Sequence, residues 1–65
     1  MKVREVIRCL ERDGWFLVST RGSHRQFKHG SKPGRVTVSG NLGRDMTPGT
    51  LASVFRQAQL WRKLP

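Results

Sequence analysis

The sequence has few of the features that would place a protein outside the reducing interior of a cell. It contains a single cysteine, Cys9, which cannot form an intramolecular disulfide. No apolar run approaches the ~20 residues that a transmembrane helix needs. The N-terminal residues lack the apolar stretch of a signal peptide. We therefore expect a cytoplasmic protein without a membrane partner.

Residues that bind metals or cofactors are also scarce. The sequence has two histidines and four acidic side chains, without the ligand spacing of zinc sites. No glycine-rich phosphate loop, dinucleotide motif or pair of catalytic carboxylates occurs. A serine–histidine–aspartate triad is disfavoured, because Ser23 and His24 are neighbours whose side chains point apart. We expect no metal and no cofactor, so any chemistry must depend on few residues.

Positive charge is what the sequence has in excess. Lysine and arginine, mostly arginine, number 13 against four acidic residues, which gives a formal charge of +9. Mixed charges suffice for solubility, so this excess favours a polyanionic partner. The planar guanidinium group of arginine binds phosphate through paired hydrogen bonds. The composition indicates nucleic acid, with a membrane surface or an acidic protein as the alternatives.

The pattern of apolar residues predicts two helices and three strands. Apolar residues recur at helical spacing in residues 2–13, and again after Thr47-Pro48, which is a favourable helix start. Gly14 is expected to end the first helix. Strands are expected at residues 15–21, 24–29 and 35–39, with a tight hairpin turn at Gly22-Ser23. The order predicts a single domain over residues 1–65: an α+β two-layer sandwich, helix–three-stranded antiparallel sheet–helix.

Strand alternation divides the predicted sheet into a core face and an open face. Phe27 and the valines of residues 35–39 are expected to point toward the helices. Either face of residues 15–21 could be the inner one, because apolar residues occupy both. Trp15 and Trp61 are expected to be at least partly buried in the core. The residues expected on the open face are His24, Gln26, Lys28, Arg35, Thr37 and Ser39.

His24 is the best candidate for a catalytic residue. Histidine exchanges a proton near neutral pH, and RNA supplies its own nucleophile, the 2′-hydroxyl. His24 could remove that proton while nearby cations stabilise the negative charge that develops on the phosphate. The alternative is an ordinary surface histidine. His29, at a strand end, is expected to be a bystander.

Several neighbours could support such chemistry. The start of the second helix, near Thr50, exposes backbone N–H groups that could hold a phosphate, although an ordinary capped helix is the alternative. The residues expected to bind RNA or to support the transition state are Arg21, Ser23, Arg25, Gln26, Lys28, Arg35 and Thr50.

Four segments resemble the HicA family of toxins, and the resemblance runs from about residue 3 to residue 60. They are Gly14-Trp15 after a short helix, Gly22-Ser23-His24-Arg25-Gln26-Phe27, Arg35-Val36-Thr37-Val38, and the helix that opens with Pro48-Gly49-Thr50-Leu51. The resemblance implies a double-stranded-RNA-binding-like fold and an mRNA-cleaving endoribonuclease of a type II toxin–antitoxin system. It also implies that His24 is the catalytic residue and that a HicB-type antitoxin masks it.

The sequence departs from the family pattern at two places. Family members often have proline and histidine shortly after the third strand, where this chain has Ser39 and Asn41. Many have Ala-Gly-Leu near the end of the last helix, where this chain has Ala58-Gln59-Leu60. We therefore expect the last helix to continue toward Trp61. Whether His29 or Asn41 assists His24 is left open.

The leading hypothesis is an endoribonuclease toxin that cleaves mRNA without a metal. It is expected to be monomeric when free and to bind a HicB-type antitoxin over the His24 face. An inactive RNA-binding module is the second hypothesis, and a domain that binds an acidic protein is the third.

Overall fold

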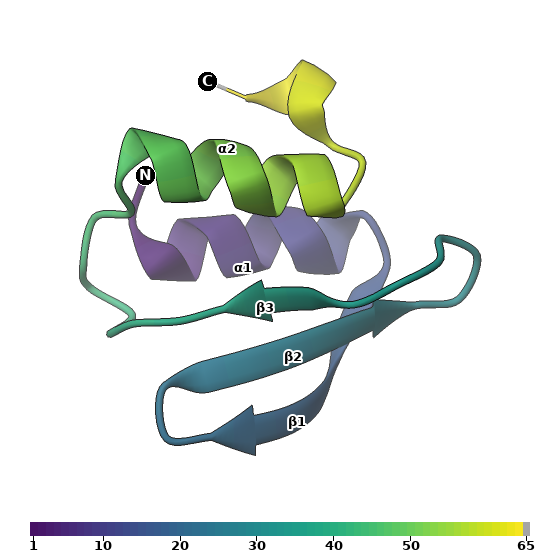
Figure 1. The fold of residues 1–65 in the computed structure, drawn as a ribbon, viewed down its shortest axis with the longest axis horizontal. Helices are drawn as coiled ribbons and strands as arrows, with labels where there is room; N and C mark the ends of the chain where they lie inside the picture. Colours follow the sequence, from purple (N-terminus) through teal and green to yellow (C-terminus); the bar gives the residue numbers. More distant parts are fainter. Residues whose placement is uncertain (65) are drawn as a thin grey trace.

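Two helices lie side by side on one face of a three-stranded antiparallel sheet (Figure 1). The computed structural model describes residues 1–64. The elements in chain order are α1 (Val3–Arg12), β1 (Trp15–Arg21), β2 (His24–His29), β3 (Val36–Val38), α2 (Pro48–Gln57) and a short 3₁₀ turn, η1 (Trp61–Lys63). This is the predicted α+β sandwich, with a third strand shorter than residues 35–39. No helix in the described part of the chain is long and apolar enough to cross a membrane.

A bulge in β1 determines which of its side chains face the helices. Leu17 pairs with Phe27, but Ser19 pairs with Gln26, so Val18 is the extra residue. A bulge reverses the alternation of side chains beyond it. Leu17 is therefore on the helix side of the sheet, whereas Ser19 is on the open side. Before the bulge, apolar residues still occupy both sides of the strand, because Phe16 pairs with Lys28 on the open side.

The core lies between the sheet and the two helices. Phe27 and the valines of β3 are buried, as predicted. Trp15 is also buried, whereas Trp61 is 52% exposed and contributes little to the core. The buried apolar residues are Val3, Val6, Leu10, Trp15, Phe27, Val36, Val38, Met46, Val54, Phe55, Ala58 and Leu60.

The loop that precedes α2 is fastened to the start of α1. The Val3 N–H donates to the Arg44 carbonyl at 2.9 Å, and the Met46 N–H donates to the Met1 carbonyl at 2.8 Å. The Arg4 N–H donates to the carbonyl of Leu42. The first N–H groups of a helix have no partner within the helix, so these bonds satisfy them. They also fix the chain between β3 and α2.

The end of α2 differs from the prediction. The helix begins at Pro48 with Thr47 as its cap, as expected, but it stops at Gln57 and does not continue to Trp61. Gln59 adopts a φ of +57°, and the Leu60 N–H donates to the Phe55 carbonyl at 2.7 Å. These are the features of a Schellman helix end. A glutamine thus occupies the left-handed position that usually holds glycine.

Candidate active site

His24 begins β2, directly after the Gly22-Ser23 turn, and its side chain is exposed. Arg25 pairs with Val38, so antiparallel register places Ser39 opposite His24. The Ser39 Oγ lies 3.2 Å from the His24 Nδ1. Among the described residues, the Nε2 of this ring has no hydrogen-bond partner. One nitrogen of this exposed ring is therefore held by the protein, and the other is without a partner in the described part of the chain.

A polar hollow on the open face of the sheet surrounds this histidine. Its lining combines one imidazole, two guanidinium groups and two uncharged polar side chains. The lining residues are Ser19, Arg21, His24, Gln26 and Arg35. The Arg35 Nη1 donates to the Gln26 Oε1 at 2.7 Å, which orients this guanidinium within the hollow. The hollow can receive an anionic group beside a proton acceptor.

Sequence reasoning placed four of these five residues near one another and missed Ser19. Plain alternation along β1 would put Ser19 and Arg21 on the same face as Trp15. The bulge at Val18 puts them instead on the face that carries Gln26. No signal in the sequence marks a bulge at Val18. The roles of these residues in RNA binding stay predictions.

Arg25 lies away from the His24 hollow. It pairs with the buried Val38, so its side chain is on the helix side of the sheet. Its Nη1 donates to the carbonyl of Gly40 at 2.9 Å and to that of Ser23 at 3.3 Å. Arg25 therefore connects the β1–β2 turn to the chain after β3.

A second hollow lies beside the start of α2 and is lined by two further residues of the predicted set. Ser23 and Thr50 lie on its wall, and Ser39 belongs to it as well. The Thr47 hydroxyl donates to the Thr50 hydroxyl at 2.9 Å, so Thr50 also takes part in the helix cap. Lys28 is exposed farther along β2, where it pairs with Phe16.

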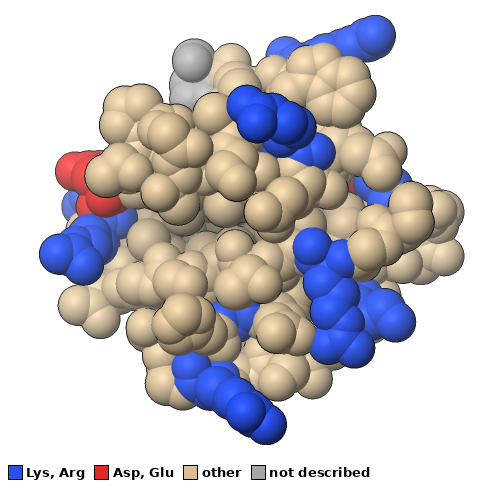
Figure 2. Space-filling view, viewed as in Figure 1, with Lys and Arg blue, Asp and Glu red and all other residues tan. Residues whose placement is uncertain are grey.

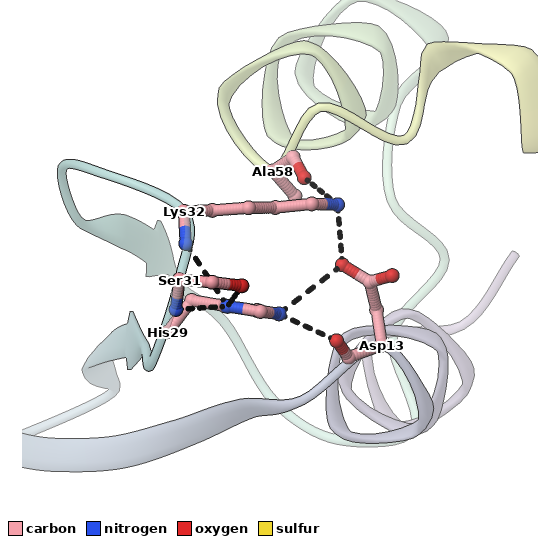
Figure 3. Close-up of polar contacts among 5 residues, drawn as sticks. All are labelled: Asp13, His29, Ser31, Lys32 and Ala58. Atoms are coloured by element: carbon pink, nitrogen blue, oxygen red, sulfur yellow. Dashed lines mark hydrogen bonds and ion pairs between the residues drawn. The ribbon is translucent and has the colours of Figure 1, made fainter.

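His29 occupies a structural joint at the opposite end of β2 (Figure 3). Its Nε2 lies 2.6 Å from the Asp13 carbonyl oxygen, and its Nδ1 accepts from the N–H groups of Ser31 and Lys32 at 3.0 and 3.1 Å. Both ring nitrogens are therefore engaged by the backbone. Such a ring holds α1 to the β2–β3 loop and is poorly suited to proton transfer. Asn41 is exposed in the loop after β3.

Lys32 completes this joint by contacting the ends of both helices. Its Nζ lies 2.5 Å from the Asp13 Oδ2 and 3.1 Å from the Ala58 carbonyl oxygen (Figure 3). The hydrogen bond from Lys32 holds the pKa of the Asp13 carboxyl below its usual value. Partial burial of the carboxyl opposes this shift, and the positive charge of Lys32 adds to it. Trp15 packs edge-to-face on His29, with ring centroids 5.2 Å apart.

Positive charge is not gathered into a single patch on the face drawn in Figure 2. Figure 2 shows lysine and arginine side chains at several separate places on one view, while acidic atoms are visible mainly at one edge. Both salt bridges found among residues 1–64 involve Asp13. Within the same residues, no three His, Cys, Asp or Glu side chains are grouped closely enough to hold a metal ion.

Two helices packed on one face of a three-stranded antiparallel sheet define a double-stranded-RNA-binding-like fold, and the opposite face carries a histidine among cations. A family model described as the HicA toxin of bacterial toxin–antitoxin systems matches residues 3–60. The chain belongs to the HicA toxin family. It is thus a toxin of a toxin–antitoxin pair, and the family implies a cognate antitoxin as its partner. No curated protein matches the chain.

Proposed function

We propose that this protein is an endoribonuclease toxin that cleaves mRNA by metal-independent catalysis, with His24 as the general base. The observation that carries the proposal is the His24 ring, which lines the same hollow as Arg21 and Arg35 and whose Nε2 has no hydrogen-bond partner among residues 1–64. A proton acceptor beside two permanent cations is what RNA self-cleavage requires, because RNA brings its own nucleophile.

The proposed reaction is an internal transfer at one phosphodiester. The His24 Nε2 takes the proton of a 2′-hydroxyl, and the 2′-oxygen forms a bond to the adjacent phosphorus. The bond from phosphorus to the 5′-oxygen breaks, and this oxygen takes a proton from water. Arg21 and Arg35 stabilise the extra negative charge on the phosphate oxygens. The products are a 2′,3′-cyclic phosphate and a 5′-hydroxyl end.

The antitoxin is proposed to be a HicB-type protein that covers the His24 face in the cytoplasm. Acidic groups on such a partner would complement Arg21, Lys28 and Arg35 and would accelerate association. The free toxin is proposed to be monomeric, since self-association would bring two highly positive surfaces together.

Replacing His24 tests the proposal directly. One general base contributes about 10²–10⁴-fold to a rate, so His24→Ala should slow RNA cleavage by that factor. Binding should change by only a few-fold, because arginine and lysine supply most of the affinity. Thr37→Ala, an exposed change on the same face of the sheet, is the matched control and should cleave normally.

Each other outcome has a defined meaning. Cleavage that survives in His24→Ala, or that EDTA abolishes in the unaltered protein, would contradict the mechanism. RNA binding without cleavage by the unaltered protein would instead establish an inactive RNA-binding module. Circular dichroism of both variants verifies that the fold is retained.

A further inference from the structure

We propose that Ser39 is the positioning residue of His24. In this role the Ser39 hydroxyl fixes the ring so that Nε2, not Nδ1, presents the lone pair to RNA. The inference deepens the proposed function and rests on it.

The geometry that carries the inference is set by the backbone. Ser39 follows β3 by one residue, and the antiparallel register places it opposite His24 on the open face. The Oγ–Nδ1 distance of 3.2 Å is within hydrogen-bonding range. Loop contacts reinforce this placement, because Arg25 donates to the carbonyl of Gly40, the next residue in the chain. The hydroxyl is therefore held beside the ring by the fold.

The chemistry explains what the contact does. A neutral imidazole carries its hydrogen on one nitrogen and its lone pair on the other. When the Ser39 oxygen accepts from Nδ1–H, the lone pair is on Nε2, which has no other partner among residues 1–64. When Nε2 has taken a proton, Nδ1–H still donates, and this bond is stronger because the donor is charged. The contact therefore stabilises the ring more after proton transfer than before it.

This difference predicts an effect on the chemical step. An interaction that strengthens toward the transition state raises kcat, whereas one that is equal in both states changes only KM. Loss of one charge-assisted hydrogen bond should lower kcat about tenfold, by the magnitudes typical of such bonds. KM should stay within about twofold, because the hydroxyl is engaged with the ring and does not bind RNA.

The experiment compares three variants by steady-state kinetics of cleavage of one RNA oligonucleotide. Ser39→Ala should lower kcat about tenfold with little change in KM. Ser39→Thr keeps the hydroxyl and should restore most of kcat. Thr37→Ala, which removes a hydroxyl from β3 on the same face, should match the unaltered protein.

A second readout does not depend on cleavage. The ¹⁵N chemical shifts of the neutral His24 ring report which nitrogen carries the hydrogen. The unaltered protein should show hydrogen on Nδ1, and Ser39→Ala should shift the population toward hydrogen on Nε2. Equal tautomer populations in the two proteins would overturn the inference.

The kinetic outcomes separate this inference from the proposed function. If His24→Ala abolishes cleavage while Ser39→Ala keeps its kcat, the function stands and the positioning role is wrong. A raised KM with unchanged kcat in Ser39→Ala would make Ser39 an RNA contact instead. Full cleavage by His24→Ala would overturn the proposed function, and the positioning role would fail with it.

Discussion

Gln59 is held in a conformation that costs an L-residue free energy. Its φ of +57° is the left-handed region, which glycine adopts without the clash of a Cβ atom. Gln59→Gly should therefore raise the free energy of unfolding by about 1 kcal/mol. Gln57→Gly is the matched control, because it changes a right-handed helical position and should lower stability by about 1 kcal/mol. Urea denaturation measures both. Equal effects of the two changes would contradict the assigned helix end.

Asp13 makes the stability of the fold depend on pH. Its folded-state pKa is lowered, mainly by the hydrogen bond from Lys32, relative to an ordinary value of 3.8. A lowered pKa means that the stabilisation is complete above the unfolded value and is lost as pH falls through the folded value. Asp13→Asn should therefore be most destabilising at neutral pH, and the difference from the unaltered protein should shrink below pH ~4.

Denaturation with urea at pH 7 and at pH 3 tests this dependence. Glu11→Gln removes a negative charge from the exposed side of α1 and controls for net charge alone. A deficit in Asp13→Asn that is the same at both pH values would show that the Lys32 contact does not carry the effect.

At the scale of elements, the junction between α1 and β1 depends on the absence of a side chain at Gly14. Gly14 has a φ of +104°, and a Cβ there would lie 2.9 Å from the His29 Nε2. Gly22 also has a positive φ, but a Cβ there would meet nothing within 4 Å. Gly14→Ala and Gly22→Ala should each cost about 1–3 kcal/mol of backbone strain.

Only Gly14→Ala adds a clash with His29, so it should be the less stable of the two alanine variants. Thermal unfolding followed by circular dichroism compares them. Equal melting temperatures would mean that His29 moves away from a side chain at position 14 without loss of stability. The His29 contacts would then not fix the end of β2 against α1.

The sequence predicts which helices and strands form more reliably than where they end and which side of the sheet each side chain faces. The spacing of Val3, Val6 and Leu10 determines the buried stripe of α1, and the alternation in β3 determines its inner face, because each period is local. The bulge at Val18 depends on pairing with β2, so the open-face position of Ser19 could not be predicted. The stop at Gln57, with Gln59 in the left-handed conformation, depends on Leu60 being buried against the core, and no local preference for glutamine indicates it.

The candidate site was predictable only in part, because some of its features follow from local alternation and others depend on strand pairing. Strand alternation together with the Gly22-Ser23 turn placed His24 on the open face, and the family resemblance singled it out. The contact with Ser39 depends on the register between β2 and β3, which a single sequence does not give. Arg25 was expected near RNA because of its charge, but its partner Val38 puts it on the helix side.

At the scale of the whole molecule, the surplus of positive charge should control RNA affinity. Four to six phosphate contacts would give a log–log salt slope of roughly −3 to −4 for single-stranded RNA. Arg35→Gln, in the His24 hollow, should reduce the steepness by about 0.7, the contribution of one phosphate. Arg56→Gln, on α2, is the matched control and should leave the slope unchanged. Filter binding over a range of salt concentrations measures both, and a nearly flat response would contradict RNA as the partner.

The central claim is that this fold lets RNA cleave itself with His24 as the base. The most direct test uses an RNA oligonucleotide with one mapped cleavage site and a second copy with a single 2′-deoxyribose on the 5′ side of that site. The account predicts a 2′,3′-cyclic phosphate on the 5′ fragment of the first. The deoxy copy should bind within a few-fold and stay intact, because the attacking oxygen is missing. Cleavage of the deoxy copy at the same position would contradict the account, since the nucleophile would then have to come from outside the RNA.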